Sequence, residues 1–304
     1  MKISALLICC MLSVAAFGQQ TQFATIGKTK LAFKTSSPEK RKPGSPIIVY
    51  EAGFGSGGGS FAPLIQLLPD IPYFIYDRNG LGESAIDPNV KTDTDVVVQL
   101  HNLLAAAKIP PPYLLVGHSL GGPYIRLYAA TYPEEVCGLL FSDPTDFMLT
   151  TAEDEAAKKA SNSKTGYIEV MKAMFGQMSG DSNPDAGVRN EAKRTLANMT
   201  AVFFREYRNL QPLKDIPVTL FISYAKKVEY NEEQMNKDLN LGINILPWWK
   251  EYDKIRIAHY ADMIAHNRQS RLILLPGYSH GIHHQDPELV AGELRELYQR
   301  CLSK

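Results

Sequence analysis

The segment Tyr113–Pro123 constrains the fold more than any other part of the chain. It reads Tyr-Leu-Leu-Val-Gly-His-Ser-Leu-Gly-Gly-Pro, an apolar run that enters a Gly-x-Ser-x-Gly pattern and then a helix-like stretch. A strand, a sharp turn and a helix in this order expose a serine hydroxyl at the turn, provided that the flanking residues are small. The pattern predicts Ser119 as a nucleophile. The alternative interpretation is a glycine-rich turn without chemistry.

Apolar runs alternate with helix-like stretches along most of the chain. Strands are expected at 47–50, 73–76, 113–116, 138–142, 218–222 and 271–275, and helices at 61–68, 92–108, 120–132 and 287–302. The strands are apolar throughout rather than alternating, which is typical of a parallel sheet covered by helices on both faces.

Two stretches interrupt this alternation. One, at about 145–215, is predicted to form a helical lid, and the other, at about 225–270, a second insertion. Its middle contains Trp248 and Trp249. Both stretches follow the carboxyl ends of predicted strands, where open α/β sheets bind their ligands.

The N-terminus is typical of a secretory signal peptide. Lys2 supplies a positive charge, residues 3–17 are apolar with small residues, and cleavage after Gly18 would leave Gln19 first. We therefore expect a signal peptide at 1–18, one domain at 19–304, and a secreted or periplasmic protein without stable membrane insertion.

Composition bears on the partners and on the cysteine chemistry that we expect. Lys+Arg and Asp+Glu are both 32, so the zero formal net charge gives no indication of a nucleic-acid partner. Signal cleavage would leave Cys137 and Cys301, which predicts two thiols or one bridge and no disulfide framework. No cysteine–histidine zinc spacing is present, and no cofactor is expected.

His280 is the candidate general base. It follows the last predicted strand, far downstream of Ser119, in the chain order serine, acid, histidine. A serine hydroxyl needs such a base at neutral pH. His283 and His284 nearby allow a second interpretation, a divalent metal site, but no cysteine or carboxylate set completes it. We expect no metal, with His283 and His284 as packing or solvated residues.

The oxyanion hole requires two backbone N–H groups. One is expected from Leu120, the residue after the nucleophile, and the other from Phe54 in the glycine-rich loop after the strand 47–50.

Two carboxylates are candidates for the acid that orients the base. Asp143 stands at the tip of the strand 138–142, which is expected beside the nucleophile strand, and Glu229 follows the strand 218–222. Asp143 is preferred, although it can also serve as a strand-end residue that caps the lid. Asp77 and Arg78 are interpreted as structural, and His118 is assigned no chemistry.

These segments together resemble the α/β-hydrolase fold family. The matching pieces are Gly53-Phe54-Gly55, Tyr76 to Ser84, Gly117 to Gly122, and Gly277 to His280 followed by Asp286-Pro287-Glu288. The resemblance implies an eight-stranded, mostly parallel sheet, a lid after the sixth strand, and a Ser-His-acid triad with Ser119 as nucleophile and His280 as base. The pattern is closest to the peptidase, esterase and haloperoxidase-like branch.

The expected function is that of an exported serine hydrolase acting on a small ester, thioester or amide. The alternative is a ligand-binding module on the same fold with a degraded triad. Substrate choice depends on how the two insertions fold over the site.

Overall fold

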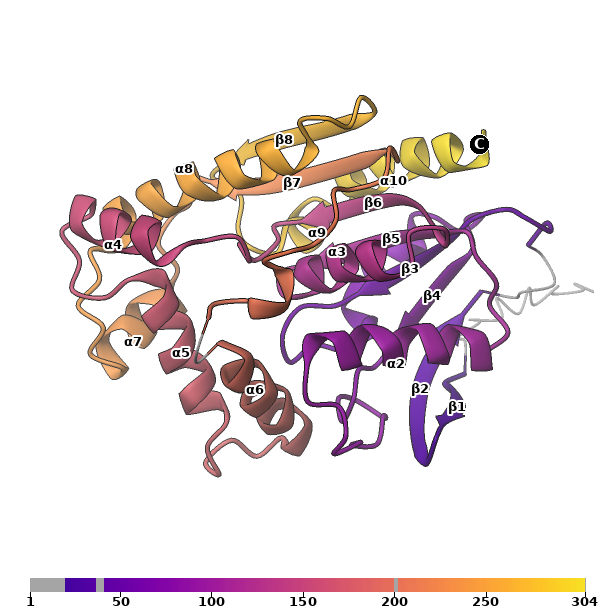
Figure 1. The fold of residues 1–304 in the computed structure, drawn as a ribbon, viewed down its shortest axis with the longest axis horizontal. Helices are drawn as coiled ribbons and strands as arrows, with labels where there is room; N and C mark the ends of the chain where they lie inside the picture. Colours follow the sequence, from indigo (N-terminus) through magenta and orange to yellow (C-terminus); the bar gives the residue numbers. More distant parts are fainter. Residues whose placement is uncertain (1–19, 37–40, 200–201, 304) are drawn as a thin grey trace, which may run out of the picture.

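Eight strands form one sheet in the computed structural model, which describes residues 20–36, 41–199 and 202–303. The strand order is β1-β2-β4-β3-β5-β6-β7-β8, antiparallel from β1 to β4 and parallel from β4 to β8 (Figure 1). The strands are β1 (Gln22–Ile26), β2 (Thr29–Thr35), β3 (Ile47–Glu51), β4 (Tyr73–Tyr76), β5 (Tyr113–His118), β6 (Val136–Ser142), β7 (Val218–Tyr224) and β8 (Ser270–Pro276). This sheet confirms the predicted mostly parallel architecture.

Helices cover both faces of the sheet. Successive residues of a strand point to opposite faces. Ile47 and Val49 therefore enter one hydrophobic cluster with the helices at 93–106 and 121–131, while Ile48 and Tyr50 enter another with the helices at 62–66 and 287–302. The helices of this framework are α1 (Ala62–Gln66) after the short 3-10 turn η2 (Gly58–Phe61), α2 (Asp93–Ala106), α3 (Gly121–Thr131), α9 (Ile282–Gln285) and α10 (Pro287–Leu302).

Further helices connect β6 to β7 and β7 to β8. The segment predicted as a lid contains α4 (Thr151–Ala160), α5 (Tyr167–Met178), α6 (Ala186–Met199) and the 3-10 turn η3 (Arg205–Tyr207). The segment 225–270 contains α7 (Tyr230–Asp238) and α8 (Ile245–Ile264). Helix α8 contacts β7 and β8, so the strand–helix alternation continues through it (Figure 1).

The predicted signal peptide lies outside the described residues. In the part of the chain that the structure describes, no helix combines the length and apolar character needed to cross a bilayer. Cys137 and Cys301 are both buried and are not bonded to each other.

Candidate active site

The turn between β5 and α3 holds Ser119 in the left-handed region, with a φ of 51°. A Cβ atom on Gly117 would come within 2.5 Å of the carbonyl oxygen of Gly121, and one on Gly121 would overlap the carbonyl oxygen of Glu51. The two outer glycines of the pattern are therefore required by the close approach of β5, α3 and the end of β3. Strained backbone of this kind clusters at functional sites.

His280 lies in the loop after β8 and hydrogen-bonds the carboxylate of Asp143. Its Nδ1 atom is 2.6 Å from Oδ2 of Asp143, which stands directly after β6 and is fully buried. The imidazole itself is about half exposed and, like Ser119, lines a cavity at this edge of the sheet. The structure thus brings three of the residues predicted from sequence to the carboxyl edge of the sheet.

Asp143 also contacts two cations that sequence reasoning missed. Its Oδ1 atom accepts from the N–H of Ser223 at 2.9 Å and forms an ion pair with Nη1 of Arg256 at 3.1 Å, and its Oδ2 atom is 3.6 Å from Nζ of Lys226. Burial opposes ionisation, but the charges of Arg256 and Lys226 hold the pKa of Asp143 well below its usual range. Asp143 is therefore an acceptor that stays ionised beside His280.

Glu229, the other candidate acid, occupies a different position. Its side chain is exposed at the N-terminus of α7, where its backbone N–H donates to Glu232 at 3.0 Å. It lines the cavity, but the carboxylate that hydrogen-bonds His280 belongs to Asp143.

The loop after β3 lies against Ser119. A Cβ atom on Gly53 would come within 3.2 Å of Cβ of Ser119. Within the described residues, no protein group accepts a hydrogen bond from the backbone N–H of Phe54 or of Leu120. Backbone N–H groups near the protein interior are almost always paired, so two unpaired donors beside a serine favour an oxyanion site.

Three further histidines, His118, His283 and His284, form one group with His280. Nε2 of His118 donates to the carbonyl oxygen of His280 at 3.0 Å, and burial followed by the charge of His280 lowers the pKa of His118 to about 4. His283 is buried against the rings of Phe61 and His118, and His284 is exposed. Among the described residues, no group of His, Cys, Asp or Glu side chains is placed to hold a metal ion.

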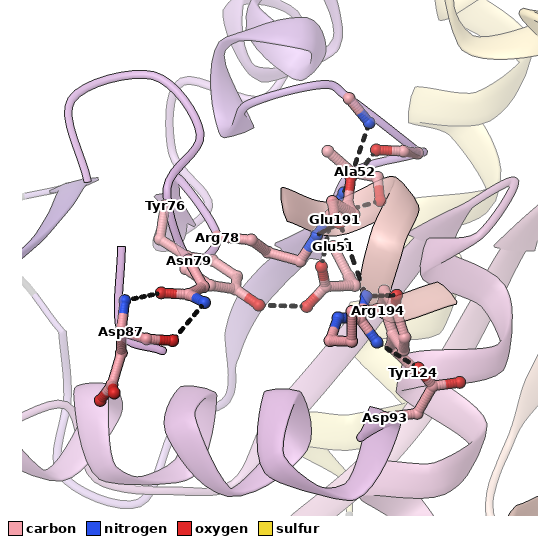
Figure 2. Close-up of polar contacts among 12 residues, drawn as sticks. Glu51, Ala52, Tyr76, Arg78, Asn79, Asp87, Asp93, Tyr124, Glu191 and Arg194 are labelled. Carbon is pink, nitrogen blue, oxygen red and sulfur yellow. Dashed lines mark hydrogen bonds and ion pairs between the residues drawn. The ribbon is translucent and has the colours of Figure 1, made fainter. Parts of the chain in front are cut away.

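A network of buried charges lies next to the loop that carries Phe54 (Figure 2). We call it the charge network, and its members are Glu51, Tyr76, Arg78, Asp93, Tyr124, Glu191, Arg194 and Tyr207. The guanidinium of Arg78 donates five hydrogen bonds, which saturates its donors. The structural role predicted for Arg78 is confirmed, whereas Glu191 on α6 was not foreseen.

A cavity of about 490 Å³ opens beside Ser119. Its lining comes from the loop after β3, the segment after β6 and helices α5, α7 and α8. The apolar part of this lining includes Val170, Met171, Met174, Met235, Trp248 and Trp249. Met171 and Phe175 also pack into the hydrophobic core. An apolar cavity with a few polar groups is the usual form of a small-molecule site.

Comparison with known proteins bears on the fold of the chain. The family model of the alpha/beta hydrolase fold matches residues 46–287. YqjL of Bacillus subtilis (strain 168) is 36% identical over 108 residues, which are 35% of this chain and 43% of YqjL. Protein phosphatase methylesterase 1 of Candida albicans is 30% identical over 153 residues, 48% of this chain and 40% of that protein. The match spans less than half of either relative.

The fold is also similar to that of solved structures. An esterase from Thermogutta terrifontis superposes with a TM-score of 0.58 at 16% identity, over 93% of this chain and 99% of the esterase. At this identity the likeness concerns the fold alone.

Proposed function

The chain belongs to the alpha/beta hydrolase fold family, and we propose that it is a serine hydrolase that cleaves a small ester, thioester or amide. The hydrogen bond between His280 and Asp143, made beside Ser119 in one cavity, is the observation that carries this proposal. Asp143 accepts from Nδ1, which leaves Nε2 of His280 as the basic nitrogen.

In the proposed reaction, Oγ of Ser119 attacks the carbonyl carbon while His280 takes its proton. The N–H groups of Phe54 and Leu120 hold the oxyanion of the tetrahedral intermediate. His280 then gives the proton to the leaving group, and water, activated by the same imidazole, releases the acyl group from Ser119. Asp143 fixes the tautomer and stabilises the imidazolium that forms.

The cavity supports a small apolar acyl group as the substrate's main recognition element. Its lining of methionine, valine and tryptophan side chains suits an aliphatic or aromatic acyl chain, and methionine adapts to differently shaped groups. We propose that the predicted lid and second insertion cover this cavity through α5, α7 and α8.

A fluorophosphonate probe tests the nucleophile. The wild-type protein is expected to be labelled covalently, while Ser119→Ala is expected to remain unlabelled and to lose at least about 10³-fold in kcat on p-nitrophenyl esters. The matched control is Ser56→Ala, since Ser56 lines the same cavity and should keep its labelling.

A panel of esters of graded acyl length and aminoacyl amides then defines the substrate class. Equal labelling of wild type and Ser119→Ala would refute the assignment. Saturable binding of panel members without turnover would support a ligand-binding module instead.

A further inference from the structure

The charge network takes no part in the chemistry proposed for Ser119, yet it contacts the loop that carries Phe54. Nη1 of Arg78 donates to the carbonyl oxygen of Ala52 at 2.6 Å, and its Nη2 donates to that of Gly53 at 2.6 Å. Arg78 is itself held between Glu51, at 2.8 Å, and Glu191, at 2.7 Å. All three charged side chains are about 97% buried or more.

The contact with Gly53 fixes the direction of the Phe54 N–H. The carbonyl of Gly53 and the N–H of Phe54 belong to one planar trans peptide group, in which the two bonds point in opposite directions. When Arg78 holds the carbonyl oxygen on one side of the loop, the N–H must point to the other side, away from Arg78. The loop itself lies against Ser119, since a Cβ atom on Gly53 would come within 3.2 Å of Cβ of Ser119.

Glu191 fixes the next peptide group. Its Oε2 atom accepts from the N–H of Gly55 at 2.7 Å, so the peptide on the other side of Phe54 is also held. The same carboxylate binds Arg78 through both oxygens (Figure 2). One glutamate on α6 therefore restrains Phe54 directly on its C-terminal side and, through Arg78, on its N-terminal side.

Helix α6 is packed closely enough to act as a fixed support. A Cβ atom on Gly187, in its first turn, would overlap the carbonyl oxygen of Gly80, so the helix lies directly on the loop after β4. Farther along, Arg194 forms a buried ion pair with Asp93 at the start of α2. Both ends of α6 are thus attached to the framework of the sheet.

We propose that Glu191 and Arg78 are positioning residues that aim the Phe54 N–H at the substrate oxyanion. Helix α6 thereby supports the reaction, although none of its described residues lines the cavity. This inference rests on the serine hydrolase function proposed above.

The expected signature is a loss of transition-state stabilisation without a loss of substrate binding. Removing one oxyanion donor typically costs about 10²–10³ in kcat. Because the variant redirects the Phe54 N–H without deleting it, we expect Glu191→Gln to lower kcat by about 10- to 100-fold with KM within about twofold. Glutamine has one acceptor oxygen, and its NH₂ group would face the donors of Arg78 or Gly55.

An alkylboronic acid gives a second readout. It forms a tetrahedral adduct with a serine nucleophile and places a negative oxygen where the oxyanion develops, so its affinity reports transition-state complementarity. The dissociation constant of the boronate should rise in Glu191→Gln by the same factor by which kcat falls, while binding of the product carboxylate should stay within about twofold.

The control is Glu135→Gln. Glu135 lies at the amino end of β6, where its carboxylate accepts from the hydroxyl of Tyr128 at 2.6 Å and contacts His101, rather than the loop or α6. Its kcat and its boronate affinity should stay within about twofold of the wild-type values, with urea unfolding measured in parallel for both variants. Equal losses of kcat in Glu135→Gln and Glu191→Gln would overturn the positioning role.

A conservative variant covers the case in which Glu191→Gln does not fold. Glu191→Asp keeps the charge but shortens the side chain, and it should show the same selective loss of kcat and boronate affinity. Unchanged kinetics in a folded Glu191 variant would refute this inference alone. A wild-type protein without Ser119-dependent turnover would instead refute the proposed function.

Discussion

From one buried position, the carboxylate of Asp143 hydrogen-bonds His280 and lies close to the cations Arg256 and Lys226. Arg256 donates to the carbonyl oxygen of Ser223 at 2.7 Å and to Asp253 at 3.0 Å. These two hydrogen bonds hold the guanidinium in place beside Asp143. Since Arg256 and Lys226 keep Asp143 ionised, loss of its charge affects both the proposed base and the two cations.

This arrangement predicts the behaviour of Asp143→Asn. An asparagine next to His280 favours the wrong tautomer, which lowers kcat by about 10⁴-fold in a comparable triad. The variant should also be less stable, because Arg256 and Lys226 lose their buried counter-ion. Steady-state kinetics and thermal unfolding measure the two effects.

Glu229→Gln is the matched control for the acid, since it removes a carboxylate from the same cavity. Its kcat should remain within about twofold of the wild-type value, because Glu229 is the N-terminal cap residue of α7 and the carboxylate bonded to His280 is that of Asp143. If Glu229→Gln instead reduced kcat as strongly as Asp143→Asn, the choice of acid would be reversed.

Sequence reasoning located Ser119, His280 and Asp143 because each follows a predicted strand, and parallel strands end at one edge of a sheet. It did not find Arg256 or Lys226. Arg256 is one of several charged residues within α8, and only the docking of that helix on β7 turns it toward Asp143 rather than solvent. Local periodicity carries no information about that rotation.

At the scale of elements, one histidine joins three segments around the cavity. Nδ1 of His259, on α8, is 2.8 Å from Asp146 after β6, and its Nε2 is 3.0 Å from Glu153 on α4. The hydrogen bond to Asp146, reinforced by Glu153, raises the pKa of His259 to about 9 despite partial burial. The imidazolium therefore links α4 to α8 at neutral pH.

This link predicts a pH-dependent contribution to stability. A raised pKa means that the folded state binds the proton more tightly, so the contribution is complete below about pH 6.5 and is lost as the pH rises through about 9. His259→Gln should lower the free energy of unfolding by about 1–2 kcal/mol at pH 6, since solvent partly screens the cluster. The difference should disappear near pH 10.

Urea unfolding at several pH values measures this difference, with His266→Gln as the control for removing an exposed histidine. A constant difference between wild type and His259→Gln across the whole pH range would show that the link is not electrostatic.

Elements with a strong local signal were predicted well. The helix expected at 92–108 is α2, and Thr92 and Asp95 cap it, since the hydroxyl of Thr92 accepts from the N–H of Asp95 at 3.0 Å. By contrast, the contact between Glu191 and Gly55 joins residues 136 positions apart. Neither residue lies in a motif that predicts this contact, because the contact depends on where α6 packs in the folded chain.

At the scale of the whole molecule, aromatic packing connects the sheet to the segments inserted after β6 and after β7. Phe141 on β6 lies 6.0 Å from Tyr260 on α8 between ring centroids, and Phe147 contacts both Tyr260 and Tyr207. All four side chains belong to one buried cluster. The inserted helices therefore share their core with the sheet.

This shared core predicts that the sheet and the inserted helices unfold together. Differential scanning calorimetry should give one transition, and near- and far-UV circular dichroism should change at the same temperature. Helical signal lost at a lower temperature, with the sheet retained, would mean that the inserted helices form a separate folding unit.

The placement of Trp248 and Trp249 has a practical consequence. They are the only tryptophans in the sequence, both line the cavity, and the ammonium of Lys226 lies 4.4 Å from the centre of the Trp249 ring. Indole emission is sensitive to nearby charge and to water. The protein therefore carries an intrinsic fluorescent reporter at its candidate active site, with which ligand titrations and stopped-flow measurements are feasible on the unlabelled wild-type chain.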